Sequence, residues 1–240
     1  MKKVLITGAN KSIGYETAKQ LAQLGYYVFI SARDADKGNA AVQQLNAEGF
    51  NNIGFIQMDV TSAASIKQAY QSLALQTTSL DVLINNAGIS GGFPQPASSY
   101  PAEEVLRVFE TNFFGVIQVT QTFLPLLKAS AAPRIVNVTS GIGSLTHQSD
   151  PLWEYYSLKG GAYGPSKTAL NAYTIALAYD LKDLGFKVNA VDPGYTATDF
   201  NNHRGYKTVA TGAAPIVQYA TIGDAGPTGG YFGEEGVIPW

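Results

Sequence analysis

The sequence contains no cysteine, which excludes a disulfide framework and a thiolate metal site. Charged residues are also scarce, at 14% of the 240 residues, and the net charge is −2. Because there is neither a basic run nor a long acidic tail, nucleic acid and anionic membrane are poor partners for this chain. No apolar run approaches the roughly 18 residues of a membrane span, and the first one ends too early, at Thr7-Gly8, for a signal peptide. We therefore expect a cytoplasmic protein that binds neither nucleic acid nor membrane.

Histidine occurs only twice, at His147 and His203, and neither has a companion at a spacing useful for a metal ligand. We expect both to lie in loops and predict no metal site. Apolar residues, in contrast, make up 45% of the chain, which is typical of a compact globular enzyme. At this length the chain can bury a full core, so we expect residues 1–240 to form a single domain.

Short apolar runs alternate with segments of helical periodicity along the chain. The runs expected to be strands are 4–6, 26–32, 53–58, 81–84, 135–138, 188–191 and 229–232. The helices are expected at about 13–24, 34–48, 62–76, 103–128 and 162–184. Strands that alternate with helices at this spacing indicate βαβ units with right-handed crossovers. The predicted fold is therefore α/β, a Rossmann-type doubly wound parallel sheet of about seven strands with helices on both faces.

The loop after the first strand is the first candidate binding site. Thr7-Gly8-Ala9-Asn10-Lys11-Ser12-Ile13-Gly14 joins a buried strand to a helix, so backbone N–H groups gather at a helix N-terminus, where a phosphate can bind. Gly8 lets the chain turn sharply, and Gly14 lets helix and strand pack closely. The alternative is a turn that binds no ligand.

Polar and glycine residues also follow the other expected strands. In an open parallel sheet, ligands bind outside the carboxyl ends of the strands. The residues at those ends are Thr7-Gly8, Arg33, Asp59, Asn86 to Gly88, Ser140 and Pro193-Gly194. Each one alone could be a helix cap or a turn, but their recurrence predicts a ligand site along this edge.

Tyr163 and Lys167 form the most specific pair in the sequence. On a helix, residues i and i+4 lie on one face, one turn apart. A phenol has a pKa of about 10 and is a poor proton donor or acceptor at neutral pH. An ammonium group one turn away favours the phenolate and lowers that pKa, which suits general acid–base catalysis. The alternative is a chance pairing, since the chain has 14 tyrosines.

Taken in order, these motifs resemble those of the short-chain dehydrogenase/reductase family. The matching residues are Thr7-Gly8…Gly14, Asp59, Asn85-Asn86-Ala87-Gly88, Asn112, Ser140, Tyr163…Lys167 and Pro193-Gly194…Thr198. Ser12 stands where the family pattern T-G-x-x-x-G-x-G has its middle glycine. The segment between Ser140 and Tyr163 is about twice as long as in the family's commoner members. This length and the ending of the chain resemble the carbonyl-reductase-like branch.

The resemblance implies a role for four residues. Tyr163 is implied to be the general acid/base, and Lys167 to hold the nicotinamide ribose and lower the pKa of Tyr163. Ser140 is implied to orient and polarise the substrate oxygen. Asn112 is implied to hold a water in a proton relay with Lys167.

The resemblance also implies a set of cofactor contacts. They are Gly8, Asn10, Lys11, Ser12, Ile13, Gly14, Arg33, Asp59, Val60, Asn86, Ala87, Gly88, Pro193, Gly194, Thr196 and Thr198, together with Tyr163 and Lys167. Of these, Asp59 is implied to contact the adenine, and residues 193–198 the nicotinamide end.

The second strand predicts which dinucleotide binds. An NAD enzyme usually carries a carboxylate at its end to bind the ribose 2′-OH, but here the expected position is Ala32. Arg33 offers a planar fork of donors suited to a phosphate, and we expect Lys11 to reach the same 2′-phosphate. Asp34 is expected to cap the next helix instead. The predicted cofactor is NADP(H), and the alternative is that both cations are ordinary surface charges.

Residues 145–158 form an insertion rich in aromatic side chains, and a substrate loop is expected at about 195–225. We predict that the substrate pocket is lined by Ser140, Trp153, Tyr156 and Tyr195, and that it favours bulky or aryl ketones, because such pockets are mostly apolar and aromatic. The alternative is that these rings pack on the protein's own surface.

The predicted function is NADPH-dependent reduction of a small-molecule ketone or aldehyde to the alcohol. One alternative is an alcohol dehydrogenase that works in the oxidative direction, and another is a dinucleotide-sensing protein without turnover. The dinucleotide-sensing alternative is disfavoured because the chain keeps the whole set of Asn112, Ser140, Tyr163 and Lys167. The sequence leaves monomer and homo-oligomer both open.

Overall fold

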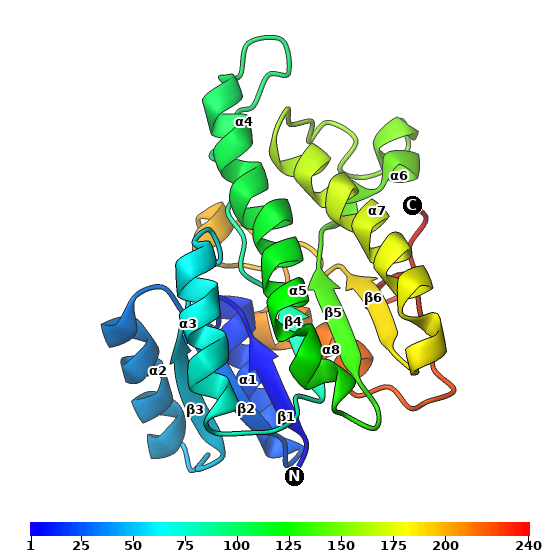
Figure 1. Ribbon diagram of the computed structural model, residues 1–240. Helices are drawn as coiled ribbons and strands as arrows, with labels where there is room; N and C mark the ends of the chain where they lie inside the picture. Colours follow the sequence, from blue (N-terminus) through cyan, green and yellow to red (C-terminus); the bar gives the residue numbers. More distant parts are fainter.

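The computed structural model describes residues 1–240 and contains one eight-stranded sheet in the order β3-β2-β1-β4-β5-β6-β7-β8. The strands are β1 (Lys3–Ile6), β2 (Tyr27–Ala32), β3 (Ile53–Gln57), β4 (Val82–Asn85), β5 (Arg134–Val138), β6 (Lys187–Val191), β7 (Tyr231–Gly233) and β8 (Gly236–Val237). Every pair is parallel except β7 with β8. The chain winds outward from β1 to β3 and then returns to β4 on the other side of β1 (Figure 1). The doubly wound prediction is confirmed, and the short antiparallel β8 is an addition to it.

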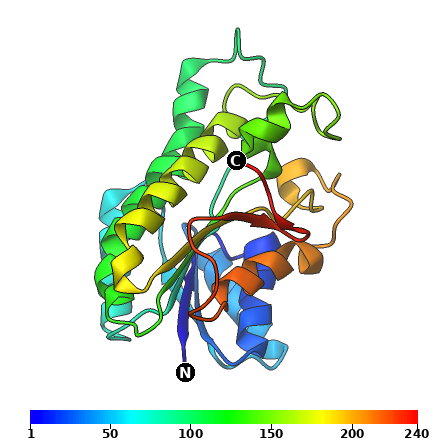
Figure 2. The same cartoon turned by 90° about the vertical axis from the view of Figure 1, so that its right-hand side faces the viewer.

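Helices cover both faces of the sheet (Figure 2). One face carries α1 (Ser12–Gln23), α2 (Ala35–Ala47) and α8 (Val209–Ala220), and the other carries α3 (Ala63–Ala74), α5 (Gly115–Lys128) and α7 (Tyr163–Asp180). Side chains of β1 alternate between the two cores, because successive strand residues point to opposite faces. Val4 and Ile6 pack into the first core and Leu5 into the second, and all three are completely buried.

The long helix expected at about 103–128 is interrupted. It consists of α4 (Ala102–Phe109), a π-helical turn (Glu110–Phe114) and α5. A π turn accommodates one extra residue in the helix and occurs often at functional sites. This turn carries Asn112.

The segment at 195–227 contains α8, which the sequence analysis did not predict. Thr208 begins this helix by accepting a hydrogen bond from the N–H of Thr211 at 3.1 Å. Pro215 lies inside the helix, and Gly212 is buried against Thr196. Because proline and glycine usually interrupt helices, the periodicity of the apolar residues was masked. A shorter helix, α6 (Leu145–Ser149), lies within the predicted insertion.

Candidate active site

The loop between β1 and α1 packs against the loop that follows β4. The Thr7 hydroxyl accepts hydrogen bonds from the N–H groups of Asn86 and Ala87, both at 2.9 Å. Gly8 has φ +63°, and a Cβ on it would lie 2.9 Å from the Ala87 Cα. A Cβ on Gly14 would lie 2.5 Å from the Asn86 side-chain nitrogen. Only glycine fits at positions 8 and 14, so the two loops expected to hold a dinucleotide lie side by side.

The N-terminus of α1 has no capping side chain. Lys11 occupies the N-cap position without a side-chain hydrogen bond to the helix, so the leading N–H groups of α1 have no partner within the helix. Ser12 begins the helix at φ +54°, in the left-handed region that glycine adopts without strain. The serine therefore adopts a backbone conformation that favours glycine, at a steric cost.

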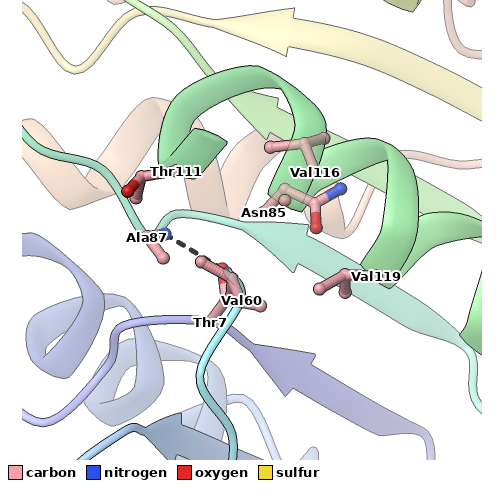
Figure 3. Close-up of a pocket in the computed structure, with 8 residues that line it drawn as sticks. Thr7, Val60, Asn85, Ala87, Thr111, Val116 and Val119 are labelled. Carbon is pink, nitrogen blue, oxygen red and sulfur yellow. Dashed lines mark hydrogen bonds between the residues drawn. The ribbon is translucent and has the colours of Figure 1, made fainter. Parts of the chain in front are cut away.

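A small hollow lies between the end of β4 and the π-helical turn (Figure 3). Its lining residues are Thr7, Val60, Asn85, Ala87, Thr111, Gly115, Val116 and Val119. A Cβ on Gly115 would lie 2.7 Å from the Val60 carbonyl oxygen, so α5 begins very close to the end of β3. Two of the predicted cofactor contacts, Val60 and Ala87, line this hollow.

The ends of β2 and β3 carry the residues expected near the adenosine. Asp59 Oδ1 accepts hydrogen bonds from the N–H of Thr61 at 2.9 Å and from its hydroxyl at 2.7 Å. The bond to the backbone N–H is the main reason why the pKa of Asp59 lies below its ordinary value. Asp34 caps α2 through the N–H of Lys37 at 3.1 Å, as expected. Arg33 is exposed and takes part in none of the ion pairs.

The predicted catalytic residues come together at the start of α7. Tyr163 is 8% exposed and Lys167 is 4% exposed. The Lys167 ammonium donates a hydrogen bond to the Val138 carbonyl at 2.9 Å and lies 5.8 Å from the centre of the Tyr163 ring. The Ser140 side chain is close enough to the Tyr163 hydroxyl to lower its pKa. The end of β5 and the first turn of α7 therefore form one cluster.

Asn112 joins this cluster from the π-helical turn. Its Oδ1 accepts from the N–H of Ile89 at 2.9 Å, and its Nδ2 donates to the Ile89 carbonyl at 2.9 Å and to the Ser166 hydroxyl at 3.1 Å. A Cβ on Gly88 would lie 3.3 Å from Asn112 Oδ1 and 3.6 Å from Lys167 Nζ. Asn112 and Lys167 therefore flank the same glycine.

Burial sets the protonation of this cluster. It raises the pKa of Tyr163 well above its ordinary value, and the neighbouring Ser140 side chain offsets only part of that rise. The direction differs from the one expected from Lys167, whose own pKa burial lowers from 10.5 to about 8. Tyr163 therefore holds its proton at neutral pH, as a proton donor must.

The segment expected at the nicotinamide end is tightly folded. Thr196 and Thr198 are buried, and the Thr196 hydroxyl donates to the Pro193 carbonyl at 3.2 Å. Gly194 has φ +73°, and a Cβ on it would lie 2.5 Å from Lys207 Nζ.

Lys11 lies closer to this segment than the sequence suggested. Its ammonium lies 2.7 Å from the Asp199 carboxylate, across 188 residues of chain. His203 contacts the same carboxylate at 3.0 Å. The loop after β1 is thus joined to the substrate loop by an exposed ion pair.

Trp153 lies beside the cluster of predicted catalytic residues. Its ring edge is 3.4 Å from the position that a Cβ on Gly141 would occupy, one residue after Ser140. The ring stacks on His147, with centres 5.1 Å apart and an angle of 23°. The insertion therefore brings an aromatic surface to the end of β5.

The other two predicted pocket aromatics differ in their surroundings. Tyr195 lies between Tyr155 and Tyr206, with ring centres 5.9 and 6.2 Å away. Tyr156 is 41% exposed, and the Lys159 ammonium lies over its ring at 4.0 Å. Tyr156 thus packs within the insertion itself.

Two rings that the sequence analysis missed pack directly on Tyr163. Phe93 lies in the loop after β4, and Phe200 lies in the short 3₁₀ turn Asp199–Asn201. Their ring centres are 6.4 and 5.2 Å from that of Tyr163, and the residues are 51% and 42% exposed. No local periodicity marks either residue, because both belong to irregular segments.

Comparison with known proteins extends the match beyond these motifs. A family model described as short chain dehydrogenase matches residues 2–208. The chain is 40% identical over 225 residues to the short-chain dehydrogenase anuI of Penicillium roqueforti, which covers 92% of this chain and 88% of that protein.

Two solved structures are similar over almost their whole length. Salutaridine reductase from Papaver somniferum has a TM-score of 0.86 and 30% identity, covering 98% of this chain and 100% of that one. NADPH-bound carbonyl reductase from chicken fatty liver has a TM-score of 0.85 and 29% identity, covering 100% and 99%. Among the helices of the present structure, none combines the length and apolarity that a membrane crossing requires.

Proposed function

The chain belongs to the short-chain dehydrogenase/reductase family, and we propose that it reduces a ketone or aldehyde to the alcohol with NADPH. One observation carries the proposal: the buried Tyr163 ring lies 5.8 Å from the Lys167 ammonium, with the Ser140 side chain close enough to lower the pKa of Tyr163. Solved relatives named as salutaridine reductase and carbonyl reductase share the fold over their whole length.

The residues around the loop after β1 fit a dinucleotide. The backbone of this loop comes close to the loop after β4 only because positions 8 and 14 are glycine. The uncapped N-terminus of α1 offers N–H groups to a pyrophosphate. When bound, NADPH supplies the hydride, and the chain's own residues supply binding, orientation and the proton.

Tyr163 gives its proton to the carbonyl oxygen as that oxygen gains charge. Its raised pKa keeps the phenol neutral before the reaction, and the Ser140 hydroxyl polarises the same oxygen by hydrogen bonding. The phenolate left on Tyr163 is stabilised by Ser140 and by the charge of Lys167. Lys167, whose pKa is lowered to about 8, then returns a proton to Tyr163 and is itself reprotonated from solvent through a water that Asn112 would hold.

Three side chains support an apolar substrate. Phe93 and Phe200 pack on the ring of Tyr163 from two different loops, and Trp153 borders Gly141. Aromatic walls with a few polar groups are typical of small-molecule pockets. We therefore expect a bulky or aryl ketone to bind with its carbonyl at Ser140 and Tyr163 and its apolar body among these rings.

Arg33 supports the choice of NADPH. It follows the buried Ala32 at the end of β2, is exposed and forms no ion pair, so its guanidinium is available for a 2′-phosphate. The related chicken carbonyl reductase was solved with NADPH bound. Alcohol oxidation is the second candidate, but it needs a deprotonated Tyr163, which the raised pKa disfavours at neutral pH.

The test is to follow the loss of reduced-cofactor absorbance with a panel of ketones and aldehydes, using NADPH and NADH in parallel. We expect turnover with NADPH and a higher kcat/KM for aryl and cyclic ketones than for small aliphatic ones. Cofactor binding without turnover of any carbonyl compound would favour the dinucleotide-sensing alternative and contradict the proposal.

A further inference from the structure

Gln95 lies buried between the loop after β4 and the start of α7, the helix that carries Tyr163. The residue is 2% exposed. A side-chain amide has one acceptor oxygen with two lone pairs and two N–H donors, and burying them is costly unless they find partners. Gln95 finds a partner for each, and all of them are backbone groups around the catalytic tyrosine.

The oxygen of Gln95 caps α7. It accepts hydrogen bonds from the N–H of Tyr163 at 3.0 Å and from that of Ala162 at 3.3 Å. The first N–H groups of a helix have no partner within it, and Ala162, at the N-cap position, offers no capping side chain. A residue 68 positions earlier in the chain therefore fixes the backbone from which Tyr163 projects.

The nitrogen of Gln95 holds the loop that carries Phe93. It donates to the Ser90 carbonyl at 2.6 Å and to the Gly92 carbonyl at 2.8 Å. The ring of Phe93, between Gly92 and Gln95 in the chain, packs on Tyr163 with centres 6.4 Å apart. One amide thus connects the catalytic tyrosine with the loop that covers it.

The surrounding chain is shaped to admit this amide. A Cβ on Gly160 would lie 2.7 Å from Gln95 Oε1, and one on Gly91 would lie 3.1 Å from Gln95 Nε2. The Gln95 carbonyl also accepts from the N–H of Gly161 at 2.9 Å. Glycines on both sides therefore leave room for the amide between the two segments.

We infer that Gln95 is a positioning residue for Tyr163, and this inference rests on the proposed function. Proton transfer needs the phenol within about 2.6–3.2 Å of the substrate oxygen, and a displacement of about 1 Å can cost about a hundredfold in rate. Loss of the cap releases the first turn of α7 and the Phe93 loop together. The loop after β1, which is expected to bind the cofactor, makes no hydrogen bond with the Gln95 amide.

The test compares three variants of the full chain in NADPH-dependent carbonyl reduction. Gln95→Leu removes both halves of the amide, whereas Gln95→Glu keeps an oxygen that can accept from the two N–H groups. Asn52→Leu is the matched control, because the Asn52 amide also holds two carbonyls, those of Ala22 at 2.9 Å and Tyr26 at 2.6 Å, beside α1.

For Gln95→Leu, we expect kcat to fall about tenfold or more with the KM for NADPH within about twofold of wild type. The isotope effect with NADPH deuterated at the transferred position should increase, because the chemical step becomes more rate-limiting. Gln95→Glu should recover only the part of kcat that depends on the cap of α7, because its second oxygen cannot donate to the Ser90 and Gly92 carbonyls. Asn52→Leu should lower the thermal stability and leave kcat within about twofold of wild type.

The inference fails if Gln95→Leu keeps kcat within about twofold of wild type. It also fails if kcat and the KM for NADPH change together, as a general loss of structure would cause. Should Gln95→Leu not fold, Gln95→Asn is held to the same criteria, because its shorter amide cannot span both sets of partners. A wild-type protein that turns over no carbonyl compound would defeat the proposed function first, and this inference with it.

Discussion

Ser12 adopts a backbone conformation that favours glycine, at the position where the family pattern has its middle glycine. Its φ of +54° lies in the left-handed region, which costs a residue with a Cβ about 1–2 kcal/mol. Ser12→Gly should remove that cost, less about 0.5–1 kcal/mol for the greater freedom of glycine in the unfolded chain. We expect a midpoint of thermal unfolding higher by about 1–4 °C. Ser12→Ala keeps the Cβ and should not raise the midpoint of thermal unfolding. A higher midpoint for Ser12→Ala, or a lower one for Ser12→Gly, would contradict the backbone strain at position 12.

Arg33 is expected to decide between the two dinucleotides. A hydrogen bond to a charged group contributes about 1.5–3 kcal/mol, so Arg33→Ala should raise the KM for NADPH about tenfold or more and change that for NADH little. Ala32→Asp should shift the preference toward NADH. Lys67→Ala, which removes an exposed cation of α3, is the control for net charge. Equal weakening of both cofactors by Arg33→Ala would show that Arg33 does not bind a phosphate.

Single residues differ in how far the sequence predicts them. Tyr163 and Lys167 could be identified because a spacing of four on a helix fixes their shared face. The shift in the pKa of Tyr163 could not, because it depends on burial by distant segments. The sequence analysis did not identify Phe93 and Gln95 for the same reason, because their partners at the start of α7 are far away in the chain.

The ion pair between Lys11 and Asp199 connects the loop after β1 with the 3₁₀ turn of the substrate loop. Exposed ion pairs contribute little to stability because solvent screens them. Asp199→Asn frees Lys11 and removes a negative charge near the expected 2′-phosphate. We therefore expect the KM for NADPH to fall about two- to fivefold, with little change for NADH.

Asp183→Asn controls for net charge, because Asp183 lies in the 3₁₀ turn Lys182–Leu184 after α7. A KM for NADPH that rises in Asp199→Asn would instead show that the ion pair prepares Lys11 for the cofactor. An equal fall of the KM for NADPH in Asp183→Asn would show that the change in Asp199→Asn comes from net charge acting at long range.

Among the elements, the regular strands could be predicted from the sequence, whereas the π-helical turn and helix α8 could not. The strands β1, β2, β4, β5 and β6 are buried and mostly apolar, as expected for parallel strands covered on both faces, although β5 and β6 each contain a buried asparagine. The π-helical turn leaves no local mark in the sequence, because its extra residue is absorbed within one long helical pattern. Helix α8 was hidden by Pro215 and Gly212, which it accommodates through packing.

Burial of Lys167 at the proposed catalytic centre lowers the stability of the whole molecule. Burial lowers the pKa of Lys167 from 10.5 to about 8, so above about pH 8 the folded protein binds fewer protons than the unfolded chain. Stability due to this group therefore rises with pH between its folded and unfolded pKa values. Relative to Lys167→Met, the wild-type protein should gain about 2 kcal/mol in unfolding free energy from about pH 8 to about pH 10.

Denaturant unfolding of both proteins across this range checks the expectation. Comparison with the methionine variant removes contributions from other titrating groups that the two proteins share. A difference between the two proteins that does not change with pH would mean that Lys167 titrates normally in the folded state.

The architecture of the whole molecule was predictable because alternation of strands and helices admits few topologies. The predicted winding places the ends of β1, β4, β5 and β6 at one edge, and there the structure brings Gly8, Gly88, Ser140 and Gly194. The exact partners at that edge depend on loops, which local patterns do not determine. Lys11 pairs with Asp199 for this reason, although the motif alone directs it to a phosphate.

The central claim is that Tyr163 protonates a carbonyl oxygen during hydride transfer from NADPH. Its most direct test is Tyr163→Phe, measured by NADPH binding and by single-turnover oxidation of bound NADPH with a ketone that the wild-type protein reduces. The ring packing on Phe93 and Phe200 survives this change, so NADPH should bind within about twofold of wild type. Hydride transfer should slow by about 10²–10⁴-fold, the usual contribution of general acid catalysis. A variant that keeps more than about a third of the wild-type rate would contradict the assignment of Tyr163 as the acid.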